Sequence, residues 1–177
     1  MRRKELFYAL LMFLFMAGCS DDKDEPTDVE QPPKEFTLVN FNNSGCKSMA
    51  ESRSGIYGFD EHFELNAIAD GGLRVRHENA VFNCASSKFA AKASMEGQDI
   101  KVTEVDITKS EWMASCVCPY DIEYEIGPLN EGKTYSMTVI TTVEPHFDDP
   151  RITVDSLKTT FRFTYSPTLS KTIPVSQ

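Results

Sequence analysis

The feature that most constrains the fold is a two-residue alternation of apolar and polar side chains between residues 112 and 126. Eight apolar or aromatic side chains fall on even numbers, opposite the polar Ser115, Asp121, Glu123 and Glu125: Trp112, Ala114, Cys116, Cys118, Tyr120, Ile122, Tyr124 and Ile126. Successive side chains of a β-strand point to opposite faces of a sheet, so this pattern predicts one long strand with a buried face. On this pattern Trp112 and both cysteines of the Cys-x-Cys pair point toward the core; a role for Trp112 in contacting a sugar or protein is the alternative.

Shorter segments with the same period fill most of the chain beyond residue 36. The turn Asp70-Gly71-Gly72 predicts a hairpin between residues 63–69 and 73–75, because glycine accepts the positive φ of a tight turn. A second hairpin is predicted between residues 88–95 and 100–107. Residues 36–41 form a first strand and residues 157–165 a last one. We expect a long irregular connection over residues 42–60.

Two segments break the alternation. Ile100 and Val102 share one parity and Val105 and Ile107 the other, which predicts a β-bulge near residues 103 and 104. A similar change of parity occurs between Val75 and Phe82. Bulges at both places would keep the apolar side chains on one face.

Residues 126–139, Ile-Gly-Pro-Leu-Asn-Glu-Gly-Lys-Thr-Tyr-Ser-Met-Thr-Val, resemble the corner of fibronectin type III and immunoglobulin-like domains. In that corner a Leu-x-x-Gly-x-x-Tyr turn leads into the next strand, and the tyrosine hydroxyl bonds back to the backbone. Tyr135, Met137 and Val139 then face inward together. With the number and spacing of the strands, this favours an all-β fold over residues 36–177, an antiparallel two-sheet sandwich of the immunoglobulin/fibronectin III type.

The N-terminus has the layout of a secretory signal, with a basic Met1-Arg2-Arg3-Lys4 followed by an apolar run that is too short to span a bilayer. The run ends in Phe-Met-Ala-Gly-Cys, which resembles the lipobox of bacterial lipoproteins, with Met16 where the family usually has Leu. The resemblance implies that residues 1–18 are removed and that Cys19 carries the lipid, palmitate among its chains, which anchors the protein in a membrane. An ordinary secreted protein with a free Cys19 is the alternative.

The segment after Cys19 is rich in acids and prolines and predicts an extended tether over residues 19–35. Its acidic cluster resembles the signal that sends lipoproteins of the Bacteroidetes to the outer face of the outer membrane, so we expect a lipid-anchored protein facing the cell exterior. A plain solvated spacer is the alternative. Removal of residues 1–18 leaves 15 basic and 26 acidic side chains, a net charge of −11 that disfavours nucleic acid as a partner.

Four cysteines remain besides Cys19, and an even number in an exported chain predicts two disulfides. They are Cys46, Cys84, Cys116 and Cys118. A zinc site made of His77 and the last three cysteines is the alternative, although paired Cys-x-x-Cys spacings are missing. In an immunoglobulin-like sandwich the strand ending at Cys84 neighbours the long strand, which implies that Cys84 bonds to Cys116 or Cys118 and that Cys46 takes the other.

Residues 76–84 and 116–126 also resemble a family of Bacteroidetes surface lipoproteins to which no activity is assigned. The family carries similar Asn-x-x-Phe-Asn-Cys and Cys-x-Cys-x-Tyr-Asp patterns. The resemblance implies a shared all-β domain and shared cysteines, and it implies no catalytic chemistry.

The sequence offers few candidate residues for catalysis or metal binding, and each has a simpler structural interpretation. Two pairs of acids, Glu104 with Asp106 and Glu123 with Glu125, could serve a glycosidase, but we expect them to be solvated on a sheet. His77 shares the parity of Leu73 and Val75, which favours a hydrogen-bonded, partly buried histidine over a ligand. The loop of residues 144–150 holds a possible metal-binding set, His146, Asp148 and Asp149, for which a surface turn is the simpler interpretation.

These patterns predict a non-catalytic binding or adhesion module that needs no cofactor and presents a rigid sandwich to a surface protein or a glycan. The alternative is a small surface hydrolase acting on glycan or peptide. A deep pocket with two carboxyl groups about 5 to 9 Å apart would favour that alternative.

Overall fold

The chain divides into two units between residues 32 and 33, and the computed structural model describes most of the second unit. The described residues are 34–47, 60–109, 114–143 and 157–175. The predictions on the signal peptide, Cys19, Trp112 and the loop with His146, Asp148 and Asp149 lie outside these ranges. No helix in the described part of the chain is long and apolar enough to cross a membrane.

The described residues form nine strands and one 3-10 turn, η2 (Ala69–Gly71), which closes the first hairpin. The strands are β1 (Thr37–Asn43), β2 (His62–Ala67), β3 (Leu73–Asn83), β4 (Phe89–Glu96), β5 (Asp99–Asp106), β6 (Val117–Gly127), β7 (Thr134–Val143), β8 (Leu157–Thr164) and β9 (Ser170–Pro174). Both predicted hairpins are present, as β2–β3 and β4–β5.

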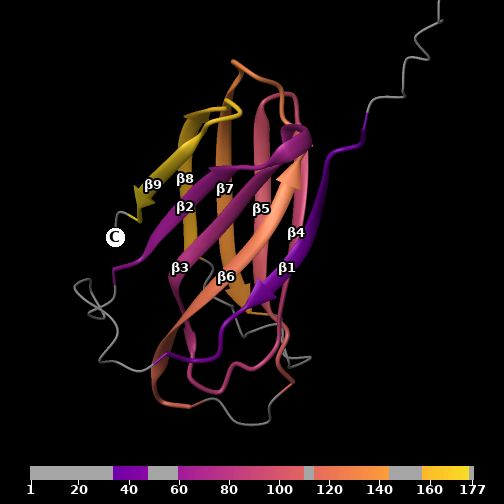
Figure 1. The fold of residues 1–177 in the computed structure, drawn as a ribbon. Coiled ribbons are helices and arrows are strands. Elements are labelled where there is room, and N and C mark those ends of the chain that lie inside the picture. The colour runs from indigo at the N-terminus through magenta and orange to yellow at the C-terminus, as the bar shows by residue number, and fades with distance from the viewer. Residues whose placement is uncertain (1–33, 48–59, 110–113, 144–156, 176–177) are drawn as a thin grey trace, which may run out of the picture. The chain divides into compact units, whose positions relative to one another are not determined.

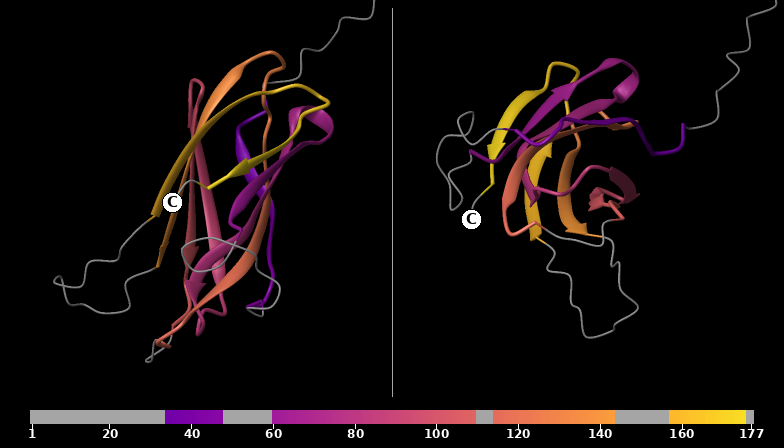
Figure 2. Two further views of the ribbon diagram at one scale, coloured as in Figure 1. Left: turned by 90° about the vertical axis from the view of Figure 1, so that its left-hand side faces the viewer. Right: turned by 90° about the horizontal axis from the view of Figure 1, so that it is seen from below.

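The strands make two sheets that pack face to face, as Figures 1 and 2 show. One sheet has five strands in the order β1-β6-β3-β2-β9 and the other has four in the order β4-β5-β7-β8. The all-β two-sheet sandwich is therefore confirmed, and its assignment to the immunoglobulin/fibronectin III type stays a prediction. Neighbouring strands are antiparallel with one departure, since β5 and β7 run parallel. The chain between them crosses to the other sheet through β6, which provides the long connection that a parallel pair requires.

The core lies between the sheets, and the even-numbered side chains of β6 fill much of it. Cys118, Tyr120, Ile122, Tyr124 and Ile126 are buried, as the alternation predicted. The predicted corner is also present: the Tyr135 hydroxyl accepts a hydrogen bond of 2.8 Å from the backbone N–H of Asn130. Tyr135, Met137 and Val139 face inward together.

Of the two predicted bulges, one is confirmed and one is wrong. The register between β3 and β6 shifts between His77 and Ala80, where Asn79 adopts a left-handed φ of 57°. In contrast, β5 pairs with both neighbours without any shift. Its inward face continues from Ile100 and Val102 to two carboxylates, Glu104 and Asp106.

The C-terminal region holds one strand more than the pattern predicted. The last predicted strand corresponds to β8, in which Phe163 is buried but Leu157 is 59% exposed. The chain then turns back, and β9 pairs with β2 as an edge of the five-stranded sheet. The alternation missed β9 because Ile173 is the only large apolar residue within it.

The four cysteines are paired as Cys46 with Cys118 and Cys84 with Cys116, each at a Cα separation of 5.6 Å. This agrees with the expectation that Cys84 bonds to one member of the Cys-x-Cys pair. The alternation predicted that Cys116 points to the core, and this is wrong. β6 begins after Cys116, which lies exposed in a bend. The zinc site built from these cysteines is therefore not formed.

Candidate functional site

Each of the two described histidines lies beside acids, His77 inside the sandwich and His62 on the outer face of the five-stranded sheet. We call the first group, made of Glu61, His77, Glu104 and Tyr124, the buried network. We call the second group, made of His62, Glu64 and Glu78, the outer cluster. The two lie on opposite faces of β2 and β3.

In the buried network, His77 lies between two carboxylates. Its Nδ1 is 2.7 Å from Glu104 Oε2 and its Nε2 is 2.9 Å from Glu61 Oε1. The Tyr124 hydroxyl donates a hydrogen bond of 3.0 Å to the second oxygen of Glu104. The ring of Phe63 stacks on the imidazole with centroids 4.1 Å apart. Both ring nitrogens therefore face acceptors, which is the arrangement of a protonated imidazolium.

The charges of this network set the protonation of His77. Burial by itself lowers the pKa of His77, but the charge and hydrogen bond of Glu104, and then those of Glu61, raise the pKa from 6.5 to about 9. Burial and the neighbouring Glu104 raise the pKa of Tyr124 well above its usual value. The network therefore holds one cation between two acids inside the core, where it links β5 to β3 and β6.

The expectation that Glu104 and Asp106 are solvated is wrong. Glu104 is fully buried in the network above, and Asp106 is 3% exposed. Asp106 accepts hydrogen bonds from the Ser86 hydroxyl at 2.5 Å and from the Thr108 backbone N–H at 2.8 Å. Buried carboxylates persist where hydrogen-bond donors satisfy them, and here those donors come from the segments flanking β4 and β5. The second pair of acids, Glu123 and Glu125, lies on the outer face as expected.

The raised pKa of His77 predicts how stability depends on pH. The pKa is about 9 in the folded protein and about 6.5 in the unfolded chain, so folding favours the protonated form. The stabilisation is fully present below pH 6.5 and is lost as the pH rises toward 9. We expect the free energy of unfolding to fall across this window by as much as about 3 kcal/mol.

Urea denaturation at pH 6, 7.5 and 9 in the presence of a chelator measures this dependence. The charged groups that face His77 are Glu61 and Glu104, and the variant His77→Gln removes the titrating group itself. The slope between pH 6.5 and 9 should be much smaller in the variant. Equal slopes in the two proteins would contradict the assignment.

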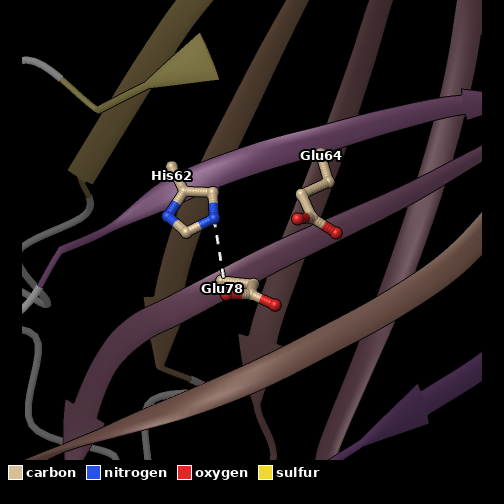
Figure 3. Close-up of side chains that lie close together, drawn as sticks. All are labelled: His62, Glu64 and Glu78. Atoms are coloured by element: carbon tan, nitrogen blue, oxygen red, sulfur yellow. Dashed lines mark ion pairs between the residues drawn. The ribbon is translucent and has the colours of Figure 1, made fainter. Parts of the chain in front are cut away.

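The outer cluster brings together three side chains of the types that can bind a metal ion, as Figure 3 shows. One ring nitrogen of His62 and one carboxylate oxygen from each of Glu64 and Glu78 lie within 4.8 Å of one another. His62 Nε2 is 3.4 Å from Glu78 Oε2, and these two side chains are 16% and 22% exposed. His62 and Glu78 are direct partners across β2 and β3, and Glu64 is diagonal to Glu78.

The β3 bulge fixes this corner of the sheet. The carbonyl oxygen of Asp60 accepts a hydrogen bond of 2.9 Å from the Asn79 side-chain amide. The same carbonyl lies 2.9 Å from His62 Nδ1. Because a carbonyl can only accept, the proton of a neutral His62 is on Nδ1, and the lone pair is on Nε2. The start of β2 is thereby tied to the bulge, and Nε2 is turned toward Glu78.

The rest of the outer face is a lattice of ion pairs. Arg74 contacts Glu125 at 2.9 Å, and Arg76 contacts Asp121 at 3.0 Å and Glu78 at 3.1 Å. Lys47 forms a further ion pair with Asp121. Burial raises the pKa of Asp121, but hydrogen bonds from Lys47, the backbone N–H of Asn79 and Arg76 outweigh it and lower the pKa. Asp121 is therefore held as a carboxylate.

The sequence predicted the buried His77 correctly and missed the outer cluster. His77 is 2% exposed and hydrogen-bonded, as its parity indicated. A signal for part of the cluster was available in His62-Phe63-Glu64, because alternate residues of a strand share a face. The contribution of Glu78 to the cluster depends on the pairing of β2 with β3, and a short sequence motif carries no information on that pairing.

Comparison of the chain with protein-family models, with curated proteins and with solved structures finds no match.

Proposed function

We propose that this protein is a lipid-anchored surface lipoprotein of the outer membrane, whose sandwich acts as a non-catalytic module for binding a surface protein or a glycan. The anchoring through Cys19 and the outward orientation are supported by the lipobox-like Phe-Met-Ala-Gly-Cys sequence and the acidic segment after it. The observation that carries the binding role is the placement of the acids in the described part of the chain.

The acids that a glycosidase would use are occupied in structural contacts. Glu104 and Asp106 are enclosed between the sheets, where a substrate has no access to them. On the outer face, Asp121 and Glu125 are engaged by arginines. A rigid sheet with a fixed pattern of charges, in contrast, provides the pre-organised surface that recognition of a partner requires.

A hollow of about 380 Å³ beside β1 supports the same proposal. Val39, Ile68, Glu125 and Pro128 are among the residues that line it. Hydrogen bonds from Arg74 and from Asn40, whose side-chain amide lies 2.6 Å away, lower the pKa of Glu125. A carboxyl group with a lowered pKa is a poor general acid, because it has no proton to donate near neutral pH.

The anchor is tested by the variant Cys19→Ala. We expect the variant to move into the soluble fraction and to lose incorporation of labelled palmitate, because the sulfur that carries the acyl chains is gone. Cys46→Ala is a control that removes a different cysteine and should leave palmitate incorporation unchanged. Labelling of Cys19→Ala at the wild-type level would contradict the assignment.

The binding role is tested with the same protein displayed on cells. A glycan array and a pull-down from host and bacterial surface fractions should each be run with wild type and with the charge-reversed variant Arg74→Glu/Arg76→Glu. We expect a specific partner whose retention falls in the variant, because those side chains order the outer face. Silence in both assays, or turnover of a glycan or peptide, would overturn the proposal.

A further inference from the structure

We propose that the outer cluster of His62, Glu64 and Glu78 is a binding site for a divalent transition metal, with Zn²⁺ as the ion that it fits best. The site rests on these three side chains and not on the anchoring or the partner proposed above. It would use three protein ligands and leave a fourth position to water, as open zinc sites do.

The spacing of the ligand atoms fits such an ion. Zinc binds histidine nitrogen and carboxylate oxygen at about 2.0–2.2 Å, so two ligands of a tetrahedral site lie roughly 3.3 Å apart. The distance of 3.4 Å between His62 Nε2 and Glu78 Oε2 matches this separation. All three ligand atoms lie within 4.8 Å of one another.

The tautomer of His62 provides the second argument. The hydrogen bond from Nδ1 to the Asp60 carbonyl keeps a proton on Nδ1, so Nε2, which lies beside Glu78, is the nitrogen that would bind a metal ion after releasing its own proton. Histidines that bind metals commonly donate their other ring N–H to a backbone carbonyl, which fixes the ring and the tautomer. Asn79 Nδ2 donates to the same carbonyl, so the supporting partner is itself held in place.

Glu78 is oriented in a similar way. Its Oε1 contacts Arg76 at 3.1 Å, which leaves Oε2 directed at His62. Arg76 in turn is held by Asp121 at 3.0 Å. The ligand set of one imidazole and two carboxylates selects among metals, because Ca²⁺ and Mg²⁺ prefer oxygen ligands alone whereas Zn²⁺ accepts nitrogen and oxygen together.

Titration calorimetry of the untagged full-length chain in detergent with ZnCl₂ tests the site. We expect one Zn²⁺ per chain at this cluster in wild type. The variants His62→Ala and Glu78→Gln should each weaken binding at least about tenfold, because even the loss of an outer-shell partner of a metal ligand costs about 10- to 100-fold in affinity. The matched control Glu123→Gln, on the same face but outside the cluster, should bind as wild type does.

Two further measurements separate this site from others. Co²⁺ bound in place of Zn²⁺ should give the visible absorption of a four-coordinate ion in wild type and lose it in His62→Ala. The variant His146→Ala should keep both signals. Failure of wild type to bind Zn²⁺, unchanged affinity in His62→Ala, or loss of binding in His146→Ala instead would each overturn the proposal. Circular dichroism without metal confirms that each variant is folded.

Discussion

Replacing Glu104 with Ala should lower the free energy of unfolding by about 3–5 kcal/mol, because it removes one of the two carboxylates that compensate the buried charge of His77 and leaves its Nδ1 without an acceptor. Glu104 is fully buried and accepts hydrogen bonds from both His77 and Tyr124. A domain of ordinary stability has about 5–15 kcal/mol in total, so this single change removes a large part of it. Denaturant unfolding at pH 7 measures the loss.

A thermodynamic cycle separates the lost ion pair from the lost side-chain volume. The variant His77→Ala should also be strongly destabilised, but the double variant His77→Ala/Glu104→Ala should be far less destabilised than the sum of the two. Glu123→Ala provides the surface control, because Glu123 is 41% exposed and lies 3.9 Å from Arg74. It should cost less than about 1 kcal/mol. Strict additivity of the two buried changes would refute the coupling.

Removal of the two disulfides should also lower the stability of the folded domain strongly. The Cys46–Cys118 and Cys84–Cys116 bonds join residues 72 and 32 positions apart. The loss of entropy that they impose on the unfolded chain corresponds to about 4.4 and about 3.7 kcal/mol, as upper values. We therefore expect the double variant Cys46→Ala/Cys118→Ala to be less stable than Cys84→Ala/Cys116→Ala, and both to unfold at a lower temperature than wild type.

Thermal unfolding with and without a reductant checks this expectation. Reduction should lower the unfolding temperature of wild type and of each double variant, and the variant that lacks all four cysteines should not respond. Peptide mapping without reduction should recover the same two pairs. A Cys46–Cys84 peptide or four free thiols would show the pairing to be wrong.

The register of β3 and β6 explains why the sequence left Cys116 and Cys118 as alternatives. Phe82 is opposite Cys118 and Asn83 is opposite Val117, so Cys84 comes to lie beside Cys116. A backbone hydrogen bond of 3.1 Å from Cys84 to Cys116 continues this pairing. On the other side of β6, the backbone N–H of Lys47 donates a hydrogen bond of 2.9 Å to the Pro119 carbonyl, and this contact brings Cys46 close to Cys118. Register depends on a bulge in β3, which the sequence placed only approximately.

The candidate sites depended even more on tertiary structure. A prediction from alternation assigns burial by residue type alone. For this reason we expected Glu104 and Asp106 to be in solvent and expected a bulge in β5, which the structure does not have. The partner that makes burial of Glu104 possible is His77, 27 positions away on another sheet. The outer cluster joins His62 and Glu64 to Glu78 in the same way, through the pairing of β2 and β3.

The sequence by itself determined the all-β class, both hairpins, the inward face of β6 and the tyrosine corner, because each depends on the period of side chains along one strand or on a local turn. The tertiary structure decided the parallel pair β5–β7, the edge strand β9, the partners of the four cysteines and both polar clusters. These features depend on which distant strands come to lie side by side. Period and turn chemistry are local properties of the chain, whereas a buried ion pair or a metal site requires groups that only folding brings together.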